Sequence, residues 1–235
     1  MAPTQRKSRP KGQAGRPTAT ELARRKARVM TIATDLFIKN GYAGTSLIDI
    51  ARGAGVATRT LYQHFGDKEA LFREVIYARD SAGALEVPQI EDGDTLFDAL
   101  FRAAQYTIDV TYRPQAIGLM RLMIAEGQRF PDFMKQAANS IYGKFQQNIK
   151  SVFDSLGQAG AIPDEDHARS AHLFSDLVNG SGPLMAYTEW RTGMPTREDL
   201  EQRVELFIRG HFGEDVLKTA RTRKIALPKS AESAT

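Results

Sequence analysis

The sequence predicts an all-α fold, and three observations support this prediction. The 235 residues include thirty Ala and eighteen Leu but only nine Val, and Ala and Leu cost less free energy in a helix than β-branched residues do. Apolar residues recur at intervals of three and four along most of the chain, which is the spacing of one helix face. No segment shows the strict alternation of apolar and polar residues that is typical of a half-buried strand.

We expect about nine helices in two folded domains. The domains cover residues 19–85 and 86–218, and the polar segment 86–94 at the start of the second is expected to be the linker between the two folded units. Residues 1–18 and 219–235 contain little to bury, so we expect a disordered basic arm and a disordered tail. The expected helices cover residues 20–40, 46–52, 57–65, a range beginning near 67, 95–112, 114–127, 131–156, 164–190 with a bend at 180–183, and 197–212. Pro114 and Pro131 are expected at the starts of their helices, and Thr196 with Asp199 predicts a capping box before the last helix.

The composition excludes several classes of protein. The chain has no Cys, which excludes disulfides, Cys-bound zinc or iron–sulfur clusters and a Cys nucleophile. The longest segment free of Asp, Glu, Lys and Arg is Leu177–Thr188, twelve residues, whereas a membrane-spanning helix needs about 20 apolar residues. We therefore expect a soluble cytoplasmic protein with no membrane partner.

The charge is unevenly distributed along the chain. Residues 1–80 carry fifteen Lys and Arg against seven Asp and Glu, while residues 81–235 carry seventeen against twenty-one. The first part therefore has a net charge of +8 and the remainder −4. A basic end on a mildly acidic body favours a polyanionic partner, although a solvated end that keeps the protein soluble gives the same pattern.

The most informative segment is 45–71, with the sequence TSLIDIARGAGVATRTLYQHFGDKEAL. It predicts two short helices joined by a tight turn at Gly53 and Gly55, which is the helix-turn-helix layout. Leu61 and Phe65 are assigned to the buried face of the second of these helices. The residues assigned to its outer face, which would meet DNA, are Thr58, Arg59, Thr60, Gln63 and His64.

Residues 25–72 resemble the DNA-binding domain of the TetR (tetracycline-repressor) family of bacterial regulators. The resemblance lies in LFIKNGY, TSLIDIARGAGV and TRTLYQHFGDKEAL. The segment RLMIAEGQRFPDF further resembles an AefR-like C-terminal subgroup of the family. Ala57 departs from the pattern, because the family often has a capping Ser there. The helix is then either capped by Thr58 or less well capped.

The resemblance and the side-chain chemistry together imply roles for individual residues in DNA binding. Arg59 and Thr60 lie where base edges in the major groove would be read. Tyr62 and His64 match positions that touch the DNA backbone. Thr45, Ser46 and Lys68 are expected at phosphates. Capping, core packing or plain solvation are the structural alternatives for these residues.

The basic arm offers a further candidate contact with DNA. Basic N-terminal arms enter the minor groove in other DNA-binding proteins. Gly15-Arg16-Pro17 resembles the centre of an AT-hook without its preceding Arg. Arg16 is therefore a candidate DNA contact, and a passive solubility tail is the alternative.

The resemblance implies that the second domain binds a small-molecule inducer and forms a homodimer. The candidate pocket residues are Phe101, Tyr106, Tyr112, Met120, Met123 and Phe133, for each of which ordinary core packing is the alternative. The candidate dimer residues, on the last two expected helices, are Leu173, Leu177, Leu184, Leu206 and Phe207.

No motif indicates catalysis, a cofactor or a metal site. The five-residue spacing of His167 and His172 does not suit chelation from one helix face, and the chain has neither a P-loop nor a GxGxxG motif. We expect a repressor that binds a palindromic operator of double-stranded DNA as a dimer and is released by an unknown inducer. The alternatives are a DNA-binding dimer without an inducer, and a helical small-molecule-binding protein or enzyme.

Overall fold

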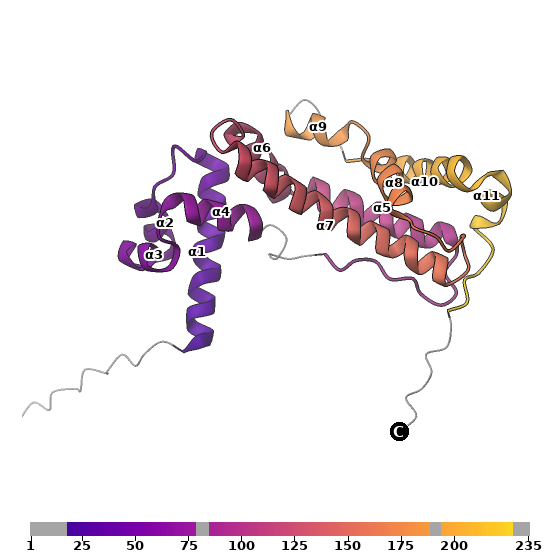
Figure 1. The fold of residues 1–235 in the computed structure, drawn as a ribbon, viewed down its shortest axis with the longest axis horizontal. Coiled ribbons are helices and arrows are strands. Elements are labelled where there is room, and N and C mark those ends of the chain that lie inside the picture. Colours follow the sequence, from indigo (N-terminus) through magenta and orange to yellow (C-terminus); the bar gives the residue numbers. More distant parts are fainter. Residues whose placement is uncertain (1–17, 79–84, 189–193, 228–235) are drawn as a thin grey trace, which may run out of the picture.

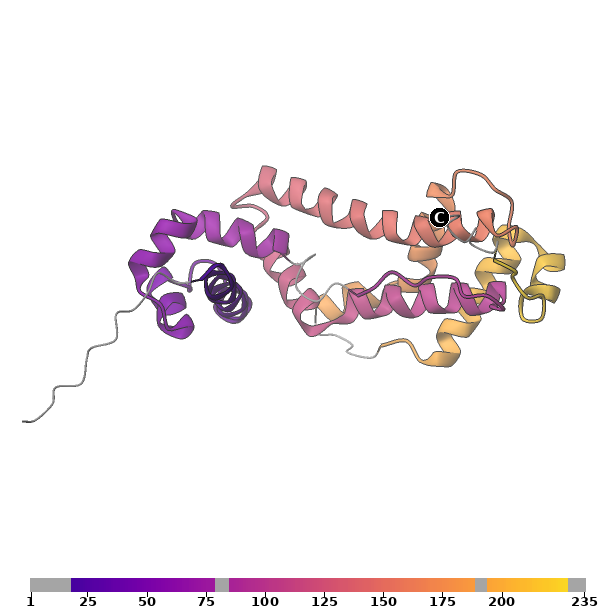
Figure 2. The ribbon, with the colours of Figure 1, turned by 90° about the horizontal axis from the view of Figure 1, so that it is seen from below.

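The computed structural model describes residues 18–78, 85–188 and 194–227, and it confirms the all-α prediction. These residues form eleven helices and no strand beyond one isolated bridge. Helices α1–α4 form one unit, and α5–α11 extend away from it along α5 and α7 (Figures 1 and 2). The helices are α1 (Ala19–Asn40), α2 (Leu47–Ala54), α3 (Thr58–Phe65), α4 (Lys68–Ala78), α5 (Leu96–Tyr112), α6 (Pro114–Glu126), α7 (Pro131–Gln158), α8 (Ala168–Asn179), α9 (Gly182–Tyr187), α10 (Arg197–Phe212) and α11 (Glu214–Ala220).

Two breaks in the backbone explain why the number of helices exceeds nine. Gly180 adopts φ +54°, a conformation that glycine tolerates best, and it separates α8 from α9 where a bend was expected. Gly213, with φ +95°, likewise separates α11 from the end of α10. The expected end of the bent helix, near Trp190, lies outside the described residues.

Side-chain caps define the starts of three long helices. Thr18, Thr95 and Thr196 each accept a hydrogen bond from the backbone of the residue three positions later, and the acidic side chain there bonds back. Such reciprocal boxes satisfy two backbone donors that a helix start leaves free. The box at Thr196 was predicted from the sequence, whereas the box at Thr18 was not.

The two ends of the second domain are more ordered than expected. In the segment expected to be a linker, Val87 and Ile90 pack against the core, and the Arg102 side chain bonds to Asp94, which holds the pKa of that carboxyl below its usual value. The described part of the expected tail is also packed. Ile225 is buried and exchanges backbone hydrogen bonds with residues 93–94. The expectation of disorder was therefore wrong for residues 219–227.

The core of α1–α4 is completed by side chains from the second domain. Phe37, Ile50, Leu61 and Phe72 are almost fully buried at its centre. The same cluster continues into α6 and α7 without a break. The residues that α6 and α7 contribute are Leu119, Leu122, Met123, Phe133, Met134 and Ala137.

Lys68 was expected at a DNA phosphate, and its position in the structure contradicts this. Its Nζ donates hydrogen bonds of 2.9 Å to the backbone oxygens of Tyr42 and Thr45, and it lies 4.3 Å from the centre of the Tyr42 ring. Burial lowers the pKa of this amine below its ordinary value. A cation in the first turn of a helix is unfavourable for the helix dipole, and the two carbonyl groups explain its presence there.

We predict that Lys68→Met destabilises the protein by about 1–3 kcal/mol, because two charge-assisted hydrogen bonds are lost and two carbonyl oxygens lose their partner. Chemical denaturation measures the change in unfolding free energy. Lys39→Met, an exposed lysine at the end of α1, is the matched control. Equal unfolding free energies for the two variants would show that the Lys68 bonds contribute nothing.

Candidate nucleic-acid interface and cavity

The helix α3 has one buried face and one exposed face, as predicted. Leu61 and Phe65 are buried in the core, with 1% and 8% of their surface exposed. The turn before the helix contains Gly55 in the left-handed conformation, with φ +66°, whereas Gly53, also expected in the turn, lies within α2. The remaining side chains face outward: Arg59, Tyr62, Gln63 and His64 are exposed, and Thr58 and Thr60 are half-buried.

The start of α3 has no side-chain cap. Ala57 is the N-cap residue and makes no such bond, and Thr58 is already the first residue of the helix. The alternative in which Thr58 caps this helix is therefore wrong. The cap residue therefore offers no hydroxyl or carboxylate oxygen to the free backbone N–H groups at this end of α3. These N–H groups lie next to Arg59 on the exposed face.

Thr45 and Ser46, expected at phosphates, use their hydroxyl groups within the domain. Thr45 is 2% exposed, and its Oγ1 lies 3.0 and 2.9 Å from the carbonyl oxygens of Leu36 and Gly41. Its side chain cannot reach DNA, so that prediction was wrong. Ser46 is half-buried, caps α2 through the backbone N–H of Asp49 and donates to the carboxylate of that residue.

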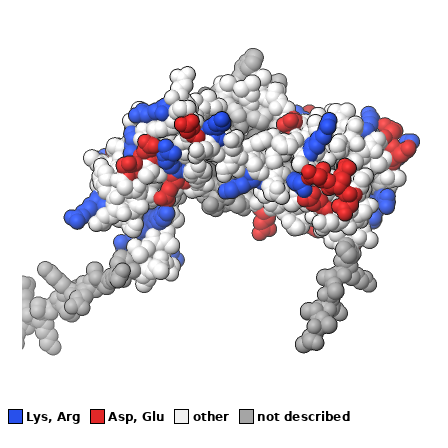
Figure 3. All heavy atoms as spheres, viewed as in Figure 1, with Lys and Arg blue, Asp and Glu red and all other residues white. Residues whose placement is uncertain are grey.

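The first turns of α1 carry basic residues that belong to none of the motifs in the sequence. Arg24, Arg25, Lys26 and Arg28 are all exposed, and Figure 3 shows Lys and Arg side chains on this part of the molecule. A β-carbon built on Gly55 would lie 3.8 Å from the Arg28 guanidinium, so Arg28 lies beside the α2–α3 turn. The excess of Lys and Arg over residues 1–80 was the available signal. Arg16 lies outside the described residues.

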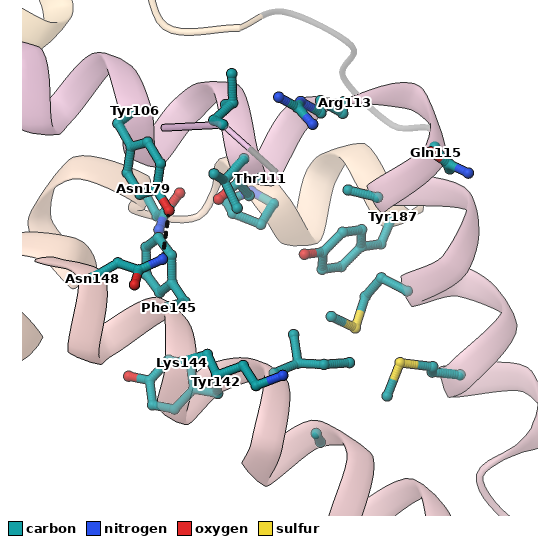
Figure 4. A pocket seen from close by; sticks show the side chains of 18 of the residues that line it. Tyr106, Thr111, Arg113, Gln115, Tyr142, Lys144, Phe145, Asn148, Asn179 and Tyr187 are labelled. Carbon is teal, nitrogen blue, oxygen red and sulfur yellow. Dashed lines mark hydrogen bonds between the residues drawn. The ribbon is translucent and has the colours of Figure 1, made fainter. Parts of the chain in front are cut away.

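A cavity of about 600 Å³ lies between α5, α6, α7 and α9 of the second domain (Figure 4). Three of the six candidate pocket residues line it: Tyr106, Met120 and Met123. The structure does not bring the other three to the cavity. Sequence patterns do not separate cavity walls from core, because both use apolar residues at helical spacing.

Those three residues are packed elsewhere. Phe101 is buried beneath the Arg197 guanidinium, which lies 4.8 Å from the centre of its ring. Phe133 belongs to the core of the first domain, 6.2 Å from the Phe72 ring. Tyr112 is buried under α9, where burial raises the pKa of its hydroxyl, and this hydroxyl has no described hydrogen-bond partner.

One end of the cavity is polar. Asn148 Nδ2 donates a 2.8 Å hydrogen bond to the Tyr106 hydroxyl. Figure 4 shows Asn179 at the same end, and its Oδ1 is buried with no hydrogen-bond partner among the described residues. Asn148 and Asn179 were not among the sequence candidates, since isolated Asn residues on helices carry no motif.

The wall of the cavity is also part of the core of the first domain. Met123 on α6 both lines the cavity and packs in the α1–α4 core. Five residues earlier, Gly118 faces Ile38 of α1 so closely that a β-carbon there would lie 2.7 Å from Ile38 Cγ2. At the end of α6, Glu126 Oε1 accepts a 3.3 Å hydrogen bond from the backbone N–H of Tyr42.

The candidate dimer residues separate into two groups. Leu173 and Leu177 on α8, Leu184 on α9 and Leu206 on α10 are 37–60% exposed. Phe207 is only 4% exposed and packs against the rings of residues 153 and 174. Phe207 is therefore a core residue, and its assignment to the dimer surface was wrong.

Comparisons with known proteins agree with this architecture. Residues 30–75 match the family described as bacterial regulatory proteins, tetR family, and residues 98–210 match the AefR-like transcriptional repressor C-terminal domain. An uncharacterised helix-turn-helix regulator of Bacillus subtilis, YvkB, is 23% identical over 188 residues, which cover 78% of this chain and 95% of YvkB.

Solved structures give the same answer. A TetR-family regulator from Mesorhizobium loti is 28% identical, with a TM-score of 0.66, covering 83% of this chain and 98% of that one. The flavonoid-responsive regulator FrrA is 27% identical, with a TM-score of 0.65, covering 86% and 99%. The two family matches fall on the two units of the fold and together span more than half of the residues. The chain is thus a member of the TetR family of helix-turn-helix transcriptional regulators.

Proposed function

We propose that this protein is a repressor that binds a palindromic DNA operator as a homodimer and is released by a small molecule in the cavity of the second domain. The observation that carries the DNA-binding part is the exposed face of α3, opposite the buried Leu61 and Phe65. The observation that carries the ligand part is the cavity, whose wall residue Met123 also packs in the core of the DNA-binding domain.

In the proposed complex, α3 enters the major groove of the operator. Arg59 binds a guanine through O6 and N7, and Thr60 contacts a neighbouring base edge. Tyr62 and His64 contact the DNA backbone. The basic first turns of α1, with Arg28 beside the α2–α3 turn, bind phosphates on the same side.

Two copies of α3 must be spaced by about 34 Å, or a multiple of the helical repeat, to read two half-sites. The proposed dimer seam consists of the exposed apolar residues of α8 and α10, Leu173, Leu177 and Leu206, which water would otherwise contact. A four-helix bundle formed by α8 and α10 from each subunit buries this surface.

Release follows from the position of α6. A ligand in the cavity contacts Met120 and Met123 on α6, and α6 is fixed to the first domain at Gly118 and Glu126. A ligand shifts the spacing of the two α3 helices only if it binds one α6 position better than the other. The alternative, a DNA-binding dimer with no ligand, leaves a cavity of about 600 Å³ without a role.

The remaining properties of the proposal concern location and chemistry. No described helix combines the length and apolarity needed to cross a membrane, and we place the protein in the cytoplasm, where its operator would be. We assign it no catalytic activity and no cofactor, because binding and release of DNA need neither. The small molecule acts as an effector and leaves unchanged.

The first prediction from the proposed function concerns base recognition. Arg59→Ala should cost about 1–3 kcal/mol of binding free energy on the correct operator and relax preference at one base pair per half-site. Arg28→Ala should weaken binding to all DNA sequences about equally. It should also reduce the slope of log affinity against log salt concentration by about one per phosphate contact. The measurement uses single-base variants of a DNA fragment from the protein's own promoter. Binding affinities at several salt concentrations give both the sequence preference and the salt dependence. Full sequence preference in Arg59→Ala would show that α3 is docked differently.

The second prediction concerns the dimer. Leu206→Glu should weaken dimerisation at least about tenfold. Because the dimer is two-fold symmetric, each subunit would place one new carboxylate in the apolar seam. Sedimentation equilibrium measures the monomer–dimer constant. Ile124→Glu on α6 is the matched control, because Ile124 is also an exposed apolar residue, with 63% of its surface accessible, but lies off the seam. A shift of equal size in both variants would contradict the proposed seam.

The third prediction tests whether α6 sets the geometry of the DNA-binding domain. Gly118→Ala should lower operator affinity about fivefold or more, because its β-carbon pushes Ile38 and α1 away from α6. Gly143→Ala on α7 is the control, since a β-carbon there has no neighbour within 4 Å. Each substitution stabilises its own helix by about 0.5–1 kcal/mol, because Ala is more favourable than Gly inside a helix. Wild-type operator affinity in folded Gly118→Ala would contradict the coupling.

A further inference from the structure

The polar end of the cavity offers one hydrogen-bond donor and one acceptor that the protein does not use. The Tyr106 hydroxyl accepts from Asn148 Nδ2, and no described residue accepts its proton. The Asn179 Oδ1 is buried and has no described donor. Both atoms belong to side chains that line the cavity (Figure 4). A buried polar atom without a partner carries a desolvation cost that a matching ligand group removes.

A hydroxyl group matches this pair, because it both donates and accepts a hydrogen bond. Its proton would bond to Asn179 Oδ1, and its oxygen would accept from Tyr106. A carboxylate only accepts, so it would leave Asn179 Oδ1 facing a negative charge. An ammonium group only donates, so it would leave the Tyr106 proton unbonded.

The rest of the lining selects the body of the ligand. Phe145, Met120, Met123 and Ile141 are apolar, and thioethers make favourable contacts with aromatic rings. None of the lining residues is Asp or Glu, while Arg113 and Lys144 are both among them. The cavity therefore has no anionic partner for a positively charged ligand.

We propose that the cavity binds an uncharged aromatic compound that carries a hydroxyl group, with the hydroxyl bonded between Tyr106 and Asn179 and the ring system against the thioether side chains. This inference rests on the proposed function, in which the cavity is the effector site. It adds the chemical class of the effector and the residues that select it.

A set of probes with one skeleton tests the class. Equilibrium dialysis with the full chain measures the binding of 4-phenylphenol, biphenyl, 4-phenylbenzoate and 4-phenylbenzylammonium, which differ only in the group at one position. The saturated 4-cyclohexylcyclohexanol tests the aromatic requirement. We expect 4-phenylphenol to bind most tightly and biphenyl to bind about tenfold more weakly, because two hydrogen bonds are lost.

Two matched variants test the residues. Tyr106→Phe should weaken 4-phenylphenol binding about fivefold and leave biphenyl binding unchanged, since it removes one hydrogen bond and retains the ring. Tyr142→Phe is the control. Tyr142 also lines the cavity, but its hydroxyl lies 3.1 Å from His172 Nδ1, where the α7 and α8 surfaces are exposed. It should leave both affinities unchanged.

The proposal is overturned if biphenyl, the carboxylate, the ammonium compound or the saturated alcohol binds as tightly as 4-phenylphenol, or if none of the probes binds. It is also overturned if the two Tyr variants lose equal affinity. Operator binding with each probe present reports separately on the proposed function. Release of DNA by 4-phenylbenzoate alone would support effector release and overturn the ligand class. Tight binding of 4-phenylphenol without release of DNA would support the ligand class and contradict effector release.

Discussion

The structure depends on one constraint: the DNA-binding domain does not close its own hydrophobic core. Four short or amphipathic helices leave an apolar face that α6 and α7 cover with Leu119, Met123 and Phe133. Burial of apolar surface is the main favourable free energy available to so small a domain. The position of α3 is therefore tied to the position of α6 through this shared core.

The junction at Tyr42 shows how polar groups adapt to this constraint. The Tyr42 ring lies 4.3 Å from Lys68 Nζ and 4.8 Å from the Arg129 guanidinium, measured to the ring centre, and its backbone bonds to Lys68 and Glu126. Residues from α4, from α6 and from the loop after α6 thus meet at the turn between α1 and α2. Cations near a ring face are attracted to its negative charge, so the junction is held by electrostatics as well as by packing.

Local chemistry determined much of what the sequence predicted correctly. The helical period, Pro at the first position of α6 and α7, the capping box at Thr196 and the glycine turn before α3 act over a few residues. They therefore appear in the sequence with little dependence on the rest of the chain. The opposite faces of α3 were predictable for the same reason, because Leu61 and Phe65 are one helical turn apart.

The sequence by itself thus determined the all-α class, the helix-turn-helix unit and the family resemblance. Only the tertiary structure decided that Lys68 and Thr45 bond within the domain and that Phe207 and Phe133 belong to cores. It also decided that Ala220 and Ile225 of the expected tail are buried in the core of the second domain. The physical reason is that a side chain's role depends on which distant groups compete for it. A lysine near two free carbonyl groups bonds to them before it can reach a phosphate, and no local pattern records that those carbonyl groups are near.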